Sequence, residues 1–299
     1  MGAGHAHGHA GGRHRWRLVV TFGMVATFFV VELVVGLLTG SLALLSDAGH
    51  MAADVVALGA ALTATSLALR PDRSGRRTYG SYRAEILASG FTVLVMLGVA
   101  TYILMEAWSR RGESVSIETG PILVVGGLGL LVNIISLVLL RPGASESLNV
   151  KGAYLEVMAD ALGSVGVLVS GILVMTTGNT GWDAILAVTI AVFVAIRAVV
   201  LGREVLTVLS QHAPAALDID AVARNLESVP GVRELHDLHV WTLTSGMDVA
   251  TAHLVVDGGP TAADVLATAQ QVLQDEHGIS HATLQVEVDP STECHRATW

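Results

Sequence analysis

The chain has 299 residues, of which 52% are hydrophobic and only 14% are charged. Soluble proteins carry about a quarter charged residues, so this composition excludes an ordinary soluble protein and indicates an integral membrane protein. The charge is also uneven, because residues 1–209 hold 14 Lys and Arg against 13 Asp and Glu, whereas residues 210–299 hold 3 against 13. The sequence therefore predicts a membrane domain followed by an acidic soluble domain, whose charge fits cations and argues against nucleic acid as a partner.

The first predicted segment is a short tail. Gly, Ala and His dominate residues 1–14, and this composition cannot bury enough apolar surface to order a chain. We therefore expect residues 1–15 to form a disordered, His-rich cytoplasmic tail. Four histidines in it either collect metal ions or have no function, namely His5, His7, His9 and His14.

Six apolar stretches follow the tail, each near or above the roughly 18 to 20 residues that a helix needs to cross a bilayer. They predict an all-α, six-helix transmembrane bundle over residues 16–209, with spans at Leu18–Leu38, Leu42–Leu69, Ala84–Trp108, Ile122–Leu140, Gly152–Met175 and Trp182–Val208. Basic residues lie before the first span and in the loops after the second and fourth spans. By the positive-inside rule we expect a multi-pass protein of the cell membrane with both termini in the cytoplasm.

Two of the spans carry paired metal-capable side chains, His50 and Asp54 in the second and Glu156 and Asp160 in the fifth. Residues four apart lie on one face of an α-helix. Because ionisable groups at bilayer depth are costly unless they are partnered, we predict that all four surround one divalent cation, and zinc suits this ligand set. The alternative is that these four side chains bind no metal and instead form structural hydrogen bonds between helices. Asp47 is either an exit-path or outer-sphere carboxylate or a polar group at the helix start.

After residue 209 the pattern changes to that of a small α+β domain over residues 210–299. We expect the order α-β-β-α-β in two layers, with helices at Asp218–Ser228 and Thr261–Gln274 and strands at Val232–Thr244, Met247–Val256 and His281–Val288. The domain contains seven histidines, and a tentative second metal site consists of His236, His253 and Glu287. For any single histidine, a hydrogen-bonded structural role is the alternative. Cys294 is the only cysteine, which excludes an intramolecular disulfide.

Four motifs resemble those of the cation diffusion facilitator family, and the resemblance covers about residues 16–290. Residues 41–54 are similar to its second helix, residues 79–87 to the start of its third, residues 149–164 to its fifth, and residues 236–241 to its cytoplasmic domain. The resemblance implies a homodimer in the lipid bilayer that exports zinc or a similar divalent ion in exchange for protons, by alternating access. It also implies a ferredoxin-like or metallochaperone-like cytoplasmic domain, the four-residue transport site named above, and metal binding at His236 and His253.

One position departs from the family's zinc pattern, which usually has His where Glu156 stands. The departure replaces a neutral nitrogen ligand with an anionic oxygen, so exporters of manganese, iron, cobalt or cadmium are the first alternative. A membrane-tethered metal sensor that does not transport is the second alternative, and a proton-coupled exporter of organic cations is the third.

Because metal needs deprotonated ligands, protons and cation should exclude each other at the site. We find no nucleophile and base pair and no nucleotide-binding loop that would indicate an enzyme.

Overall fold

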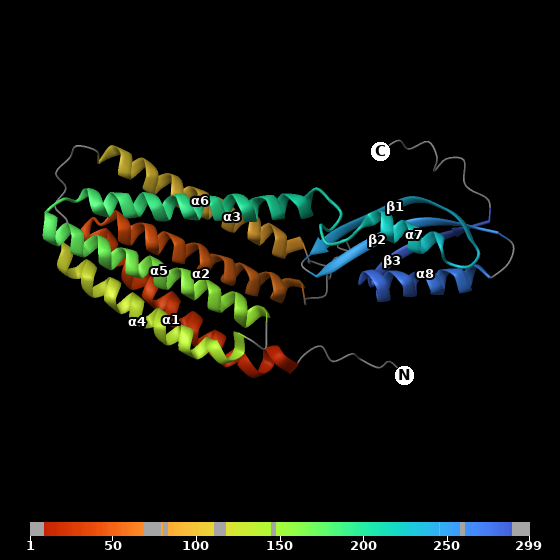
Figure 1. Cartoon of the computed structure of the whole chain (residues 1–299), viewed down its shortest axis with the longest axis horizontal. Coiled ribbons are helices and arrows are strands. Elements are labelled where there is room, and N and C mark those ends of the chain that lie inside the picture. Colours follow the sequence, from red (N-terminus) through yellow and green to blue (C-terminus); the bar gives the residue numbers. More distant parts are fainter. Residues whose placement is uncertain are drawn as a thin grey trace. The chain divides into compact units, whose positions relative to one another are not determined.

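Six long helices make up the first two thirds of the chain (Figure 1). The fold is that of a computed structural model, which describes residues 9–68, 79, 83–110, 118–144, 148–244, 246–257 and 261–288. The helices are α1 (His9–Thr39), α2 (Leu42–Ala68), α3 (Arg83–Ser109), α4 (Thr119–Ala144), α5 (Leu148–Thr177) and α6 (Gly181–Leu209). Each of the six predicted spans is thus helical over the residues that the structure describes, and only Leu69 of the second span lies outside them.

The predicted tail is partly wrong. Helix α1 begins at His9, so residues 9–15 belong to a helix, whereas residues 1–8 lie outside the described part of the chain. The physical reason is that adding a turn to an existing helix avoids the unfavourable nucleation step, so even a weakly apolar stretch can extend it.

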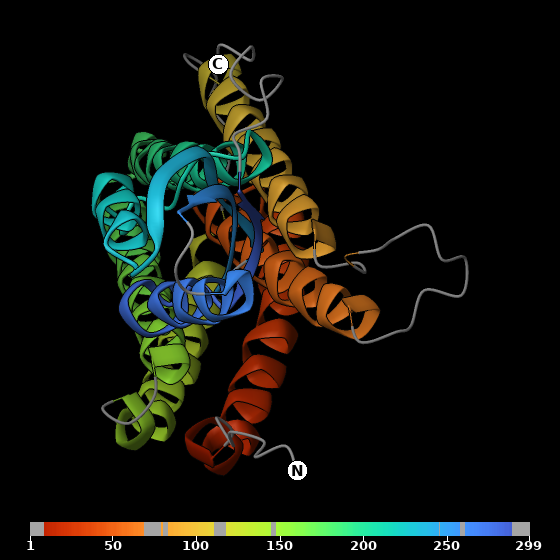
Figure 2. The same ribbon diagram turned by 90° about the vertical axis from the view of Figure 1, so that its right-hand side faces the viewer.

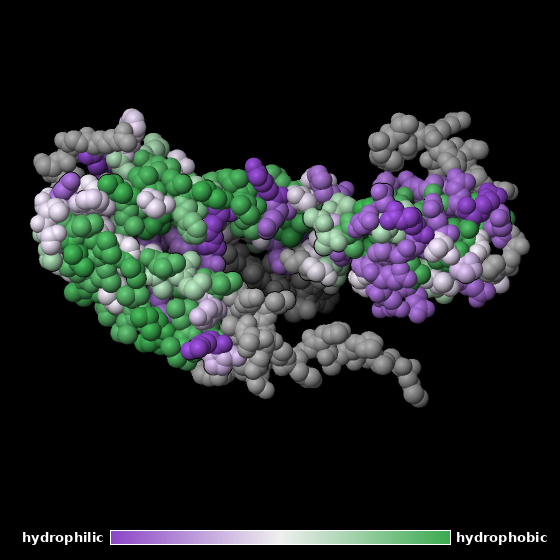
Figure 3. Space-filling model, viewed as in Figure 1, coloured by the Kyte–Doolittle hydropathy of each residue, from purple (hydrophilic) through white to green (hydrophobic). Residues whose placement is uncertain are grey.

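The surfaces of these helices are those of a membrane protein. Within the described residues, five of them contain apolar stretches long enough to cross a bilayer: Val19–Thr39, Arg83–Ser109, Thr119–Pro142, Tyr154–Thr177 and Gly181–Leu209. Large apolar side chains point outward, for example Leu38, Leu94 and Leu162 with 80%, 67% and 70% exposure. Hydrophobic residues dominate the visible surface of this helical part, whereas hydrophilic residues dominate that of the C-terminal domain (Figure 3). A contiguous apolar surface of this extent is expected against lipid.

The chain forms two compact units, residues 1–60 with 91–201, and residues 61–90 with 202–299. In the first unit, α4 lies along both α1 and α5 (Figure 1 and Figure 2). One buried apolar cluster joins α1, α2, α4 and α5, and a second joins α2, α3 and α6. Helix α2 belongs to both clusters and therefore lies between the two groups of helices.

Small residues allow close approach to α2. A Cβ atom on Gly49 would collide with the side chain of Val99 in α3. A Cβ atom on Gly163 of α5 would lie 2.7 Å from Oδ1 of Asp47 in α2. Glycine at these two positions therefore lets α3 and α5 pack against the helix that carries His50 and Asp54.

The first turn of α2 is capped by a residue from α6. Asp183 accepts hydrogen bonds through Oδ2 from the backbone N–H groups of Leu42 (2.7 Å) and Ala43 (3.3 Å). Its Oδ1 accepts a further bond from Ser41 Oγ at 2.6 Å. The first N–H groups of a helix have no partner within the helix, so this buried carboxyl group satisfies them and fixes the position of α2 against α6.

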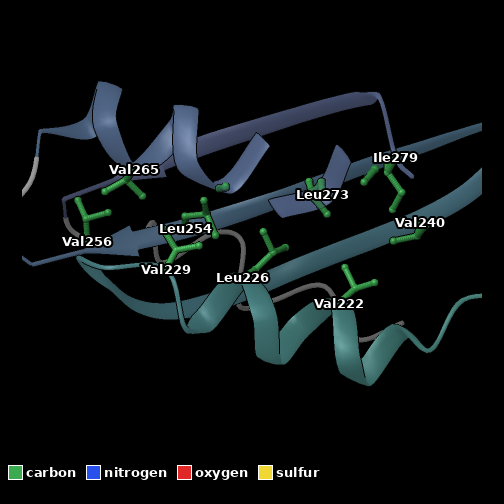
Figure 4. Packing of buried hydrophobic residues seen from close by; sticks show 11 residues of the cluster. Val222, Leu226, Val229, Val240, Leu254, Val256, Val265, Leu273 and Ile279 are labelled. Carbon is green, nitrogen blue, oxygen red and sulfur yellow. The ribbon is translucent and has the colours of Figure 1, made fainter. Parts of the chain in front are cut away.

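The C-terminal domain confirms the predicted α-β-β-α-β order, with α7 (Ile219–Glu227), β1 (Val232–Thr244), β2 (Met247–Val256), α8 (Ala262–His277) and β3 (His281–Glu287). The strands form one sheet in the order β1-β2-β3, in which β1 and β2 are antiparallel and β2 and β3 are parallel. Asp218 and Thr261, the first residues of the two predicted helices, cap α7 and α8. Leu226 of α7, Leu254 of β2 and Leu273 of α8 meet in one core, so both helices pack on one face of the sheet (Figure 4).

Candidate metal sites

The first group of ligand atoms lies inside the helical bundle. His50 Nε2 in α2 lies 3.4 Å from Asp160 Oδ1 in α5 and 3.9 Å from Asp54 Oδ2 in α2. These three residues offer ligand atoms within 4.8 Å of one another. Ligands bound to a tetrahedral zinc ion at about 2.0–2.2 Å lie roughly 3.3–3.6 Å apart, so only small movements would bring all three onto one ion.

Burial makes the polar atoms of this group energetically costly when they have no partner. His50 and Asp160 are each 4% exposed. Within the described residues, Asp54 Oδ2, Asp160 Oδ1 and His50 Nδ1 are buried atoms that take part in no hydrogen bond. A buried polar atom without a partner costs about 1–3 kcal/mol. A cation between the two carboxylates and the imidazole would remove most of this cost.

Glu156, the fourth predicted ligand, lies outside this group of three. Its Oε1 lies 2.6 Å from a guanidinium nitrogen of Arg197 in α6. The other terminal nitrogen of Arg197, NH1, lies 3.4 Å from His50 Nε2. Because a guanidinium can only donate, His50 Nε2 would be the acceptor of any hydrogen bond in this contact. Arg197 was not among the predicted site residues, although a basic residue within an otherwise apolar span is a signal for one.

Asp47 is 2% exposed and lies in α2 one turn before His50. It is not among the three residues whose ligand atoms lie within 4.8 Å of one another. Its Oδ1 would lie 2.7 Å from a Cβ atom on Gly163 of α5. The structure therefore places Asp47 between α2 and α5, beside the helix that carries Asp160.

The second group of ligand atoms lies in the C-terminal domain, with one residue from each strand. His253 Nδ1 in β2 lies 2.7 Å from Glu287 Oε1 in β3, and His236 Nε2 in β1 lies 3.5 Å from Glu287 Oε2. Their ligand atoms also fall within 4.8 Å of one another. Gln285 donates a further hydrogen bond of 2.7 Å to Glu287 Oε1. The structure thus brings together all three residues that the sequence suggested for this domain, and two imidazoles with a carboxylate suit zinc or a similar borderline cation.

A β-bulge shapes this second group. His236 pairs with His253 and His239 pairs with Thr251, so three residue steps in β1 oppose two in β2. The extra residue shifts His239 onto the face that carries His236 and His253, because alternate residues of β2 share a face. Asp237 lies in the bulge with φ of 54°. Its Oδ1 lies 2.9 Å from His239 Nε2 and its Oδ2 lies 3.9 Å from His253 Nε2.

Two family matches cover nearly the whole chain. Residues 18–210 match the cation efflux transmembrane domain, and residues 214–289 match the cytoplasmic domain of cation efflux proteins. The boundary between the two matches falls where the sequence composition changes. The helical bundle and the α+β domain of the structure therefore correspond to the two domains of one family.

Relatives that match this chain over nearly their full length agree with the two family matches. The chain is 44% identical over 298 residues to the metal cation efflux system protein CzcD of Cupriavidus metallidurans, which covers 99% of this chain and 94% of that one. It is 36% identical to the zinc transporter ZitB of Escherichia coli, over 97% of this chain and 95% of that one. It is 33% identical to a cadmium, cobalt and zinc/H(+)-K(+) antiporter of Bacillus subtilis, over 97% of this chain and 93% of that one. A solved metal-bound C-terminal domain of the CzcD transporter from Cupriavidus metallidurans matches with 38% identity over 24% of this chain and 100% of that one, at a TM-score of 0.23. The matched family and its members are metal transporters and not enzymes. The chain belongs to the cation diffusion facilitator family of divalent metal efflux transporters.

Proposed function

We propose that the protein exports Zn²⁺ from the cytoplasm in exchange for protons, by alternating access to a site formed by His50, Asp54, Glu156 and Asp160. The observation that carries the proposal is the buried group of His50, Asp54 and Asp160, whose ligand atoms lie within 4.8 Å of one another. One imidazole with carboxylates is a ligand set that zinc accepts readily. Cadmium and cobalt are the competing substrates, because a relative is named as an antiporter of cadmium, cobalt and zinc.

Exchange with protons follows from the chemistry of the same atoms. Carboxylates and imidazole bind metal only when deprotonated, so metal binding releases protons and proton binding releases metal. The buried oxygens of Asp54 and Asp160 that take part in no hydrogen bond within the described residues can bind either a proton or a metal ion. A cycle in which metal enters from one side and protons from the other therefore needs only one site with two accessible states.

The orientation that we propose places both termini and the C-terminal domain in the cytoplasm of a cell-membrane protein. Three arginines near the start of α1 and the basic residues in the loops after the second and fourth spans support it. The description of the family that matches residues 214–289 as a cytoplasmic domain also supports it.

We also propose a resident metal in the C-terminal domain. His236, His253 and Glu287 would hold it, and bound there it would cross-link the three strands of the sheet. The fit rests on two imidazoles and a carboxylate that converge on one face of the sheet. As in the family that it resembles, this domain would hold two copies of the chain together as a homodimer.

Transport by the purified protein in proteoliposomes tests the proposal. A zinc gradient should drive proton flux, read by an internal pH indicator, and Asp160→Ala should reduce the flux at least about a hundredfold, because it removes a ligand and the charge that balances the ion. Glu204→Ala removes an exposed acid from α6 and should leave the flux unchanged. Metal binding by the wild type without any flux would instead support a sensor. Undiminished flux in Asp160→Ala would exclude the proposed site.

A further inference from the structure

Arg197 is a cation built into the proposed transport site. It lies sixteen residues after Gly181, the start of α6, or about 24 Å along the helix. Its two terminal nitrogens reach different helices, Glu156 in α5 at 2.6 Å and His50 in α2 at 3.4 Å. The side chains of Arg197 and Glu156 are both about one third exposed, so water screens this ion pair less than one at the protein surface.

The charges of the site balance only when Arg197 is counted. His50 is neutral when it ligates a metal ion, and three ionised carboxylates, Asp54, Glu156 and Asp160, carry a charge of −3. The guanidinium of Arg197 stays protonated at all physiological pH values, and it brings the total to −2. A divalent cation then gives an electrically neutral site, whereas without Arg197 the loaded site would keep one excess negative charge.

An excess negative charge would oppose transport, because transport needs release as well as binding. Two unit charges a few ångströms apart inside a protein interact by several kcal/mol. A site of charge −3 would therefore hold a divalent cation more tightly than a site of charge −2 and release it more slowly. A site of charge −1 would bind the cation too weakly to load at low concentration.

We propose that Arg197 is a positioning and specificity-determining residue that neutralises Glu156 and so sets the charge of the transport site at the value that lets a divalent cation both bind and leave. This inference rests on the proposed function, since it assumes that the four side chains handle the transported ion. It accounts for the glutamate at position 156, because the pair Glu156 and Arg197 carries the same net charge as one neutral ligand.

Charge-swap variants of the full-length protein test the inference. Arg197→Gln should lower the Kd for Zn²⁺ and also lower the maximal transport rate, each by at least about tenfold, because the excess charge stabilises the loaded site. Glu156→His keeps a side chain that can ligate but makes the site −1, so it should raise the Kd at least about tenfold. The double variant Glu156→His with Arg197→Gln restores −2 and should return the Kd and the rate to within about threefold of wild type.

Two further variants separate charge from structure. Arg197→Lys keeps the charge without the planar fork and should stay close to wild type in Kd. Arg203→Gln removes an exposed arginine from the same helix and should change neither quantity. Binding is measured by titration calorimetry in detergent, with every variant in a His253→Ala background so that the C-terminal group does not contribute, and transport is measured in proteoliposomes.

The outcomes are distinct. A lower Kd in Arg197→Gln together with recovery in the double variant supports the inference. A higher Kd in Arg197→Gln, or a double variant worse than either single variant, would overturn it and assign Arg197 a packing role. If the wild-type protein neither binds nor transports a divalent cation, the proposed function itself fails, whatever the Arg197 variants do.

Discussion

The two ligand groups of this protein use the same side-chain types on different scaffolds. The first takes His50 and Asp54 from α2 and Asp160 from α5, all deep within a helical bundle. The second takes His236, His253 and Glu287 from three neighbouring strands of an open sheet. Helices present ligands one turn apart along an axis, whereas strands present them side by side across a face.

The groups differ in how the protein satisfies their carboxylate oxygens. In the sheet, Glu287 Oε1 already accepts from Gln285 and contacts His253 at 2.7 Å. In the bundle, buried oxygens of Asp54 and Asp160 take part in no hydrogen bond within the described residues. A group whose atoms pair with one another can persist without an ion, whereas a group with unsatisfied atoms favours an ion or proton at all times. The second arrangement suits a site through which ions pass, since one cation is always exchanged for another.

The most severe test of this comparison removes the bundle ligands. We expect Asp54→Ala with Asp160→Ala to abolish transport and to lower the metal content by one ion per chain, because two of three converging ligands are lost. Elemental analysis of the purified protein measures this. Metal bound by His236, His253 and Glu287 should remain, and loss of all metal from the double variant would contradict the independence of the two groups.

Removing the sheet group should have a smaller effect on transport. His253→Ala should lower the metal content of the C-terminal domain but reduce the transport rate less than about tenfold, because a group outside the bundle can tune transport without carrying the ion. Elemental analysis and the proteoliposome assay give the two readings. His281→Ala, which removes an exposed histidine from β3, is the matched control. Complete loss of transport in His253→Ala alone would show that the sheet group is essential.

The scaffold of the bundle group can be tested through Asp183. Asp183→Ala leaves the N–H groups of Leu42 and Ala43 and the hydroxyl of Ser41 without their acceptor, so it should destabilise the protein by about 2–3 kcal/mol. Thermal unfolding in detergent measures the change. Asp257→Ala, which breaks an exposed ion pair with Arg233, should cost less than about 0.5 kcal/mol. Equal stability of the two variants would exclude the capping role.

The scaffold of the sheet group can be tested through Asp237. Its φ of 54° is tolerated by Gly and by Asp but is strained for Ala, so Asp237→Ala should be less stable than Asp237→Gly by about 1 kcal/mol. Both variants lack the carboxylate, so the difference between them reports backbone strain alone. Chemical unfolding followed by tryptophan fluorescence, with Trp241 in the same strand, measures it. An Ala variant as stable as the Gly variant would mean that the bulge relaxes.

Much of the fold was predictable because local patterns determine it. Apolar length predicted the six long helices, five of which are long and apolar enough within the described residues to cross a bilayer. Alternation together with capping residues located the three strands and two helices of the C-terminal domain. The pairing of His50 with Asp54 followed from helical periodicity, and the convergence of α2 and α5 followed from the cost of burying charged groups. Each of these inferences uses residues close in sequence or a general property of the bilayer.

The features that escaped prediction depend on distant contacts. Strict alternation would place His236 and His239 on opposite faces, and only the register shift against β2 reveals the bulge. The contact of Glu156 with Arg197 depends on the rotation of α5 relative to α6, which apolar periodicity does not define. The helical conformation of residues 9–15 was missed because composition ignores the helix to which they are attached.

The cap on α2 also constrains how the protein is made. The ribosome synthesises Leu42 and Ala43 about 140 residues before Asp183, the residue whose carboxyl group receives their N–H groups. Until the last span enters the membrane, the helix that carries His50 and Asp54 lacks the anchor at its first turn. A nascent chain interrupted before α6 would therefore leave the first turn of α2 without its acceptor groups.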